Sequence, residues 1–221
     1  MGRRQGRLRE GAQGRAAPRA RTRRRVRSRL KPDSKPPRRS VLRQWLHAPG
    51  SLSRRLAALG DRFAVQTLRQ GPARLHRREI EQLGHHARGR VWVREVLLRV
   101  DGLPMIWARS VAPRPSLAGP WRALLGLGSR PLADLLFKDP RVTRSPLRVE
   151  HLSHGSPLRE RMLRQWFKAN GHKPPHNMVW ARSSIFHKHG APLRVMEVFS
   201  PKLAGWKPPI GKQIAKDSTR H

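Results

Sequence analysis

Apolar and polar residues alternate on both sides of an Asp-Gly pair within residues 92–111. Asp101-Gly102 favours the positive backbone angles of a tight hairpin turn, so the pattern predicts two paired strands. Pairing outward from this turn sets Arg94 opposite Arg109, in phase with the apolar residues of each strand. The pattern therefore predicts two guanidinium groups side by side on an otherwise apolar face.

Two like charges on an apolar face need an explanation. Like charges directly opposite each other destabilise a sheet, and a buried charge without a partner costs several kcal/mol. One interpretation is that an anion binds against Arg94 and Arg109. The other is that the sheet has an open edge, where both arginines simply reach water. The hairpin pattern alone leaves both interpretations open.

A second hairpin is predicted near the end of the chain, from residues 178–186 and 193–199 around the turn segment 187–190. Glu197 alternates in phase with the apolar residues of its strand. A buried glutamate is rare unless it is paired, so Glu197 is the counterpart that the two arginines lack, provided that the hairpins meet.

The rest of the pattern predicts short elements between these hairpins. Strands joined as hairpins with helices between them indicate a single α+β domain on an antiparallel sheet. Ser51 is a candidate N-cap of a helix that Gly60 ends. We further expect a strand at 63–68, a connecting loop at 71–89, a loop at 113–120, short covering helices at 121–127 and 131–137, a weaker strand at 142–149, a helix at 158–169 and a loose end at 202–221.

Charge is distributed unevenly along the chain. The 221 residues carry a formal net charge of +36, and residues 1–40 alone hold 16 Lys/Arg against 2 acidic residues. This segment has few large apolar residues, so we expect it to be a disordered basic tail. It fits an RNA-binding arm that makes non-specific nucleic-acid contacts, and it fits equally a passive extension or a start codon placed too far upstream.

Composition also excludes several classes of site. The absence of cysteine rules out disulfides and thiolate metal sites. His85-His86 and the pair His187 and His189 lie in expected loops without a metal-binding motif, so no metal site is expected. No apolar run approaches 18 residues, so we expect no membrane span and a soluble, cytoplasmic protein.

Several sequence blocks together resemble the chorismate pyruvate-lyase family, which makes 4-hydroxybenzoate for ubiquinone synthesis. The blocks are WVREVLL, DGLPMIWARSVAP, SLAGP, LGSRPLADLLF and MEVFSP, and they follow the family order. The resemblance covers residues 41–206 and leaves 207–221 as a polar C-terminal tail. It implies a sheet of about six antiparallel strands, with helical flaps over a buried ligand cavity.

The resemblance also implies site residues. Family positions that contact substrate correspond to Leu52, Arg94, Leu132 and Glu197, the Leu132 contact being through its backbone, and Arg109 matches an arginine beside the site. Arg94 is expected to bind the ring carboxylate of chorismate, and Glu197 to accept from the ring hydroxyl as the acid–base group. Arg109 is expected to hold the second carboxylate or to brace Glu197. The implied reaction needs no metal or organic cofactor, and we expect a monomer.

The sequence departs from the family pattern at four places. Leu52 stands where some relatives have methionine, and Ala133 stands where glycine is usual. Residues 180–184 read WARSS in place of WGRRS, and residues 151–177 resemble an insertion.

Two other functions are compatible with the chain. The charge fits a nucleic-acid-binding protein, although no RNA- or DNA-binding module is recognisable. The fold also occurs as a non-catalytic, ligand-sensing domain of transcription regulators, although no helix-turn-helix segment precedes it here.

Overall fold

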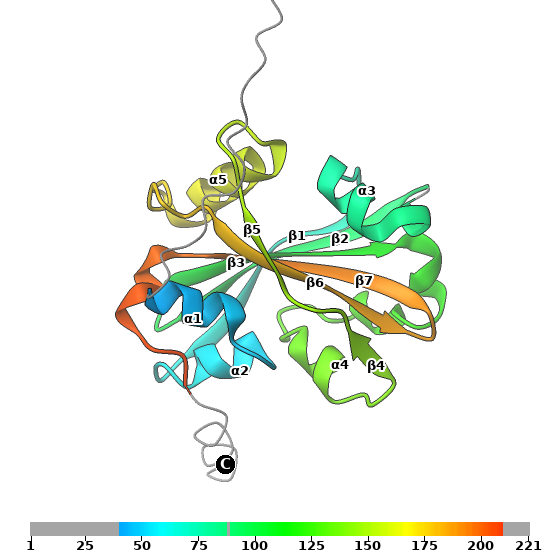
Figure 1. The fold of residues 1–221 in the computed structure, drawn as a ribbon, viewed down its shortest axis with the longest axis horizontal. Helices are drawn as coiled ribbons and strands as arrows, with labels where there is room; N and C mark the ends of the chain where they lie inside the picture. The colour runs from blue at the N-terminus through cyan, green and yellow to red at the C-terminus, as the bar shows by residue number, and fades with distance from the viewer. Residues whose placement is uncertain (1–39, 88, 210–221) are drawn as a thin grey trace, which may run out of the picture. The chain divides into compact units, whose positions relative to one another are not determined.

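One antiparallel sheet organises the computed structural model, which describes residues 40–87 and 89–209 (Figure 1). The strands follow the order β1-β2-β3-β7-β6-β4, and β5 also pairs with β6. Their bounds are β1 Phe63–Ala73, β2 Val91–Val100, β3 Leu103–Pro113, β4 Val142–Arg144, β5 Arg148–His151, β6 Trp180–Lys188 and β7 Ala191–Phe199. The α+β class and the antiparallel sheet are confirmed.

The sheet has seven strands because two short ones share the edge along β6. β4 pairs with the end of β6 near Lys188, and β5 pairs with its beginning near Trp180. Pro146 lies between them and has no N–H to donate to a ladder. The expected single strand at 142–149 is therefore wrong, since it is divided in two.

Helices cover both faces of the sheet, and Figure 1 shows them on opposite sides. The face that carries Arg94, here called the pocket face, packs against two apolar clusters that include the first two helices and the segments after β3. These elements are α1 Val41–His47, α2 Leu52–Ala57, η2 Arg114–Ala118, η3 Arg122–Leu124 and α4 Ala133–Phe137. The opposite face, here called the back face, carries Leu97 and Trp107 and packs against α3 Arg77–Leu83 and α5 Pro157–Asn170.

The longest helix forms as its sequence predicts. Ser156 caps α5 by accepting from the backbone N–H of Arg159 at 3.3 Å, and Gly171 ends it with a φ of 73°. Leu158, Met162 and Trp166 recur at helical spacing and are buried on the back face. The helix expected at 158–169 is confirmed within one residue at each end.

The turn of the first hairpin is also confirmed, with φ values of 48° at Asp101 and 78° at Gly102. Its register differs from simple pairing, because Arg99 faces Pro104 while Leu98 faces Ile106. Met105 is thus an extra residue, and its carbonyl accepts from the N–H of Ser200 at 2.9 Å instead.

This β-bulge reverses the faces of the sheet to which the later side chains of β3 point. Arg94 lies opposite Ser110, and Arg109 lies opposite Glu95. Because side chains alternate along a strand, a shift of one residue moves Arg109 to the back face. The expectation that Arg94 and Arg109 share one face is wrong.

The second hairpin keeps a regular register. His189 and Gly190 have φ values of 48° and 74°, so the turn is two residues long and both strands reach it. Arg182 consequently lies directly opposite Glu197. The turn was expected to span four residues, 187–190, but it consists only of His189 and Gly190.

Three other expectations about loops and helices need correction. The loop expected at 71–89 is wrong, because β1 runs to Ala73 and α3 follows it. The helix expected at 121–127 is only the 3-10 turn η3. The loose end expected from residue 202 instead forms η4 (Pro201–Gly205), where Leu203 is fully buried. The expected tail at 1–40, apart from its last residue, and most of the C-terminal tail lie outside the described residues.

Candidate active site

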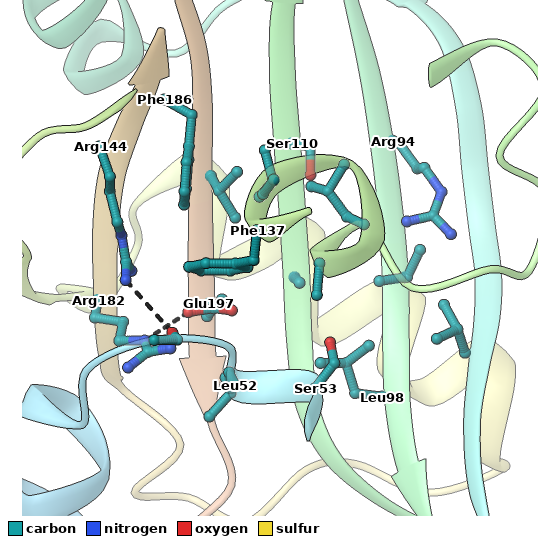
Figure 2. Close-up of a pocket in the computed structure, with 18 residues that line it drawn as sticks. Leu52, Ser53, Arg94, Leu98, Ser110, Phe137, Arg144, Arg182, Phe186 and Glu197 are labelled. Atoms are coloured by element: carbon teal, nitrogen blue, oxygen red, sulfur yellow. Dashed lines mark hydrogen bonds and ion pairs between the residues drawn. The ribbon is translucent and has the colours of Figure 1, made fainter. Parts of the chain in front are cut away.

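A small cavity lies on the pocket face between strands β2, β3, β7 and β6 and the covering helices α2 and α4. Its volume is about 50 Å³, which is space for about three or four water molecules. Leu52 and Leu132 line it from the covering side. Most of its wall is apolar, and its charged lining residues are Arg94, Arg144, Arg182 and Glu197 (Figure 2).

Arg94 stands on β2 at one end of the cavity (Figure 2). Its side chain is buried, and Nη2 donates to the carbonyls of Gly128 at 2.8 Å and Arg130 at 3.0 Å, in the segment before α4. Its Nε is also buried, and no acceptor lies against it within the part of the chain that the structure describes. Burial lowers the pKa of Arg94 to about 10, so it stays cationic at neutral pH. An unpaired buried donor of this kind favours an anion in the cavity.

Glu197 stands at the other end, fixed by its cross-strand neighbour. Arg182 Nε donates to Glu197 Oε2 at 2.5 Å, while Arg182 Nη1 donates to the carbonyl of Ala48 at 2.7 Å. Arg182 is buried, but 16% of the Glu197 side chain remains exposed. The carboxylate is therefore held in place and keeps an open side towards the cavity.

Arg144 lies on β4 close to this pair (Figure 2). Its Nε donates to Ser184 Oγ at 2.9 Å, and its guanidinium carbon lies 5.1 Å from the Phe186 ring centre and 5.9 Å from that of Phe137. Within residues 40–87 and 89–209, no carboxylate lies within 4.0 Å of it. Burial, then the charge of Arg182, lowers the pKa of Arg144, and Glu197 only partly offsets this.

The charges that line the cavity do not balance, because three arginines face one carboxylate and leave a formal charge of +2. Sequence reasoning placed Arg94, Glu197, Leu52 and Leu132 in the site, and all four line this cavity. It missed Arg144 and Arg182. Pairing outward from His189-Gly190 would have found Arg182, as it sets this residue opposite Glu197.

Arg109, the fifth expected site residue, does not line the cavity. On the back face its Nε donates to Glu79 Oε1 at 2.6 Å, its Nη2 donates to Glu79 Oε2 at 3.0 Å, and its Nη1 pairs with Glu95. Arg161 and Gln165 of α5 also donate to Glu95. The expectation that Arg109 braces Glu197 or holds a substrate carboxylate is therefore wrong. Its charge is satisfied by two buried glutamates.

This buried network makes stability depend on pH. Burial opposes ionisation of Glu79 and Glu95, but the hydrogen bonds and charges of Arg109 and Arg161 outweigh it and lower both pKa values below 4.5. A carboxyl whose pKa is lower in the folded state adds stability above its unfolded value and loses it as pH falls.

We therefore expect the free energy of unfolding, measured in urea, to fall steadily as the pH drops below about 4.5. Glu79→Gln should flatten this dependence, because the variant has one proton fewer to take up. The matched control is Glu81→Gln, since Glu81 is on the same helix and its side chain is 58% exposed. An equal pH dependence in the wild type and Glu79→Gln would contradict the assignment.

Comparison with known proteins gives the family. The family model described as chorismate lyase matches residues 30–206. A probable chorismate pyruvate-lyase of Albidiferax ferrireducens is 44% identical over 169 residues, which are 76% of this chain and 86% of the relative. Its namesake in Aromatoleum aromaticum is 39% identical over 73% of this chain and 85% of that relative. The chain belongs to the chorismate lyase family.

The departure from the family pattern at WARSS affects one face of the sheet. This chain keeps Arg182, which lines the cavity, and has Ser183 where the family pattern has a second arginine. Ser183 is on the back face, where its hydroxyl pairs with Glu150. The lost arginine therefore belongs to the far side of the sheet and not to the cavity.

The chorismate lyase fold also has distant structural likenesses. The effector domain of PhnF from Mycobacterium smegmatis matches at a TM-score of 0.45 and 11% identity, over 69% of this chain and 90% of that one. A likeness this weak carries no functional argument.

Among the described residues, no three histidine or acidic side chains gather in a group that could hold a metal ion. No helix in the same ranges is long and apolar enough to cross a membrane.

Proposed function

We propose that this chain removes pyruvate from chorismate and releases 4-hydroxybenzoate, as an early step of ubiquinone synthesis in the cytoplasm. The observation that carries the proposal is the formal charge of +2 around the cavity. Chorismate bears two carboxylates, so its charge complements that of the lining. A charged ligand binds in a partly dry cavity only if such complementary groups offset its lost hydration.

The distribution of the charges suggests an orientation. Arg94 and Glu197 stand at opposite ends of the cavity, as the ring carboxylate and the ring hydroxyl do in chorismate. Arg94 binds the ring carboxylate, using the donor that now lacks a partner, and Glu197 accepts from the hydroxyl. Leu52 and Leu132 close over the ring, the latter also through its backbone.

The reaction breaks the bond between the ring carbon and the ether oxygen. The neighbouring ring carbon, which bears the hydroxyl, loses its hydrogen as a proton, and the released enolpyruvate gains a proton to become pyruvate. Aromatisation supplies much of the driving force, so the protein has to hold one conformer and stabilise the moving charge. Glu197 is the acid–base group of the cavity, because it is the carboxylate in the lining.

The test is to incubate the purified full chain with chorismate and to follow 4-hydroxybenzoate and pyruvate together. Equal amounts of the two products, formed at a rate proportional to protein concentration, are expected. Binding of 4-hydroxybenzoate without turnover of chorismate would favour a ligand-sensing domain. Salt-sensitive RNA binding that disappears on deletion of residues 1–40, again without turnover, would favour a nucleic-acid-binding protein.

A further inference from the structure

Arg144 is the charged residue of the cavity that the proposed orientation leaves without a role. Arg94 takes the ring carboxylate, and Arg182 already serves Glu197 and the carbonyl of Ala48. Arg144 has no carboxylate within 4.0 Å among residues 40–87 and 89–209, although its side chain lines the cavity. Its cationic group is thus available to a ligand.

The position of Arg144 is fixed by its surroundings. Ser184 Oγ accepts from its Nε, and the rings of Phe186 and Phe137 pack against its guanidinium group. The carbonyl of Gly50 lies 3.5 Å from its Nη1, which is a long contact. A guanidinium held in this way can bind a carboxylate at little cost in side-chain entropy.

The geometry of the substrate identifies which of its groups would reach Arg144. In chorismate the enolpyruvyl ether is attached to the ring carbon next to the one that bears the hydroxyl. If Glu197 holds the hydroxyl, the side chain of the ether lies at the same end of the cavity, where Figure 2 shows Arg144. We propose that Arg144 binds the carboxylate of the enolpyruvyl group and holds the leaving pyruvate. This inference rests on the proposed function.

Two ligands separate this role from a structural one. Chorismate carries the enolpyruvyl group, whereas 4-hydroxybenzoate carries the ring carboxylate and hydroxyl without it. Arg144→Gln should lower kcat/KM for chorismate about 10- to 100-fold, the usual loss of a charge-assisted hydrogen bond. The Kd of 4-hydroxybenzoate, measured by calorimetry, should change less than about threefold.

Two further variants serve as references. Arg94→Ala should weaken the binding of both ligands, because both carry the ring carboxylate. Arg114→Gln removes an exposed arginine of η2 that does not line the cavity, and should alter neither value. If Arg144→Gln does not fold, Arg144→Lys is measured instead and should show a smaller loss that is again confined to chorismate.

The outcomes are distinct. Equal losses for chorismate and 4-hydroxybenzoate, or no loss for chorismate, would overturn the role of Arg144 while leaving the proposed function in place. A wild-type protein that does not turn over chorismate would instead overturn the proposed function itself.

Discussion

Glu197→Gln is expected to lower kcat for chorismate by about 10² to 10⁴, the usual contribution of a positioned acid–base group. The amide has nearly the same shape as the carboxylate, but it cannot take up a proton at neutral pH. Substrate binding should not suffer, because the charge of the cavity rises when its carboxylate is neutralised. We therefore expect the KM for chorismate to stay level or to fall, in steady-state assays at low salt.

The control for this variant is Glu81→Gln, which neutralises an exposed glutamate of α3 that does not line the cavity. Its kcat and KM should both equal those of the wild type. Thermal unfolding should show that Glu197→Gln remains folded despite the loss of the ion pair with Arg182. A higher KM at unchanged kcat would mean that Glu197 contributes only to binding, and would refute its role in the reaction.

The sequence predicted the hairpins well because their turns are local. Asp101-Gly102 and His189-Gly190 favour positive φ, and the alternation of apolar residues marks the strands on either side. It mispaired Arg94 with Arg109 because a single inserted residue, Met105, reverses every later side chain of β3. At the bulge, the carbonyl of Met105 accepts from the N–H of Ser200, which belongs to a distant part of the chain.

Helix α3 was missed for a related reason. Its buried residues are Glu79 and Leu83, so it lacks the apolar stripe from which a helix is usually predicted. Glu79 is buried because Arg109 reaches it from β3, a partner that is not visible in the local pattern. Arg144 was missed because β4 is only three residues long, which is too short to show which way a side chain points.

Arg109→Met is expected to be strongly destabilising, since it leaves two fully buried glutamates on the back face without their shared cation. Removal of one partner from a buried pair costs about 3 to 5 kcal/mol, a large share of the stability of a typical domain. Urea unfolding of the variant and the wild type at neutral pH measures this loss.

The double variant Arg109→Met/Glu79→Met should regain part of the loss. It removes the charge of Glu79, which without Arg109 keeps Arg194 at 3.6 Å as a more distant cation, while Glu95 keeps its contacts with Arg161 and Gln165. Replacing a whole buried pair with apolar residues is often nearly neutral, so the double variant should be more stable than Arg109→Met alone. No such recovery would mean that the network contributes to stability in some other way.

The same pair of variants tests whether Arg109 contacts the substrate. Arg109 lies on the other face of the sheet from the cavity, so the double variant, once folded, should bind 4-hydroxybenzoate as the wild type does. Loss of binding in a variant that unfolds at the wild-type urea concentration would return Arg109 to the active site. Stability and binding thus separate the two arginines of the first hairpin, of which Arg94 lines the cavity and Arg109 binds Glu79 of α3.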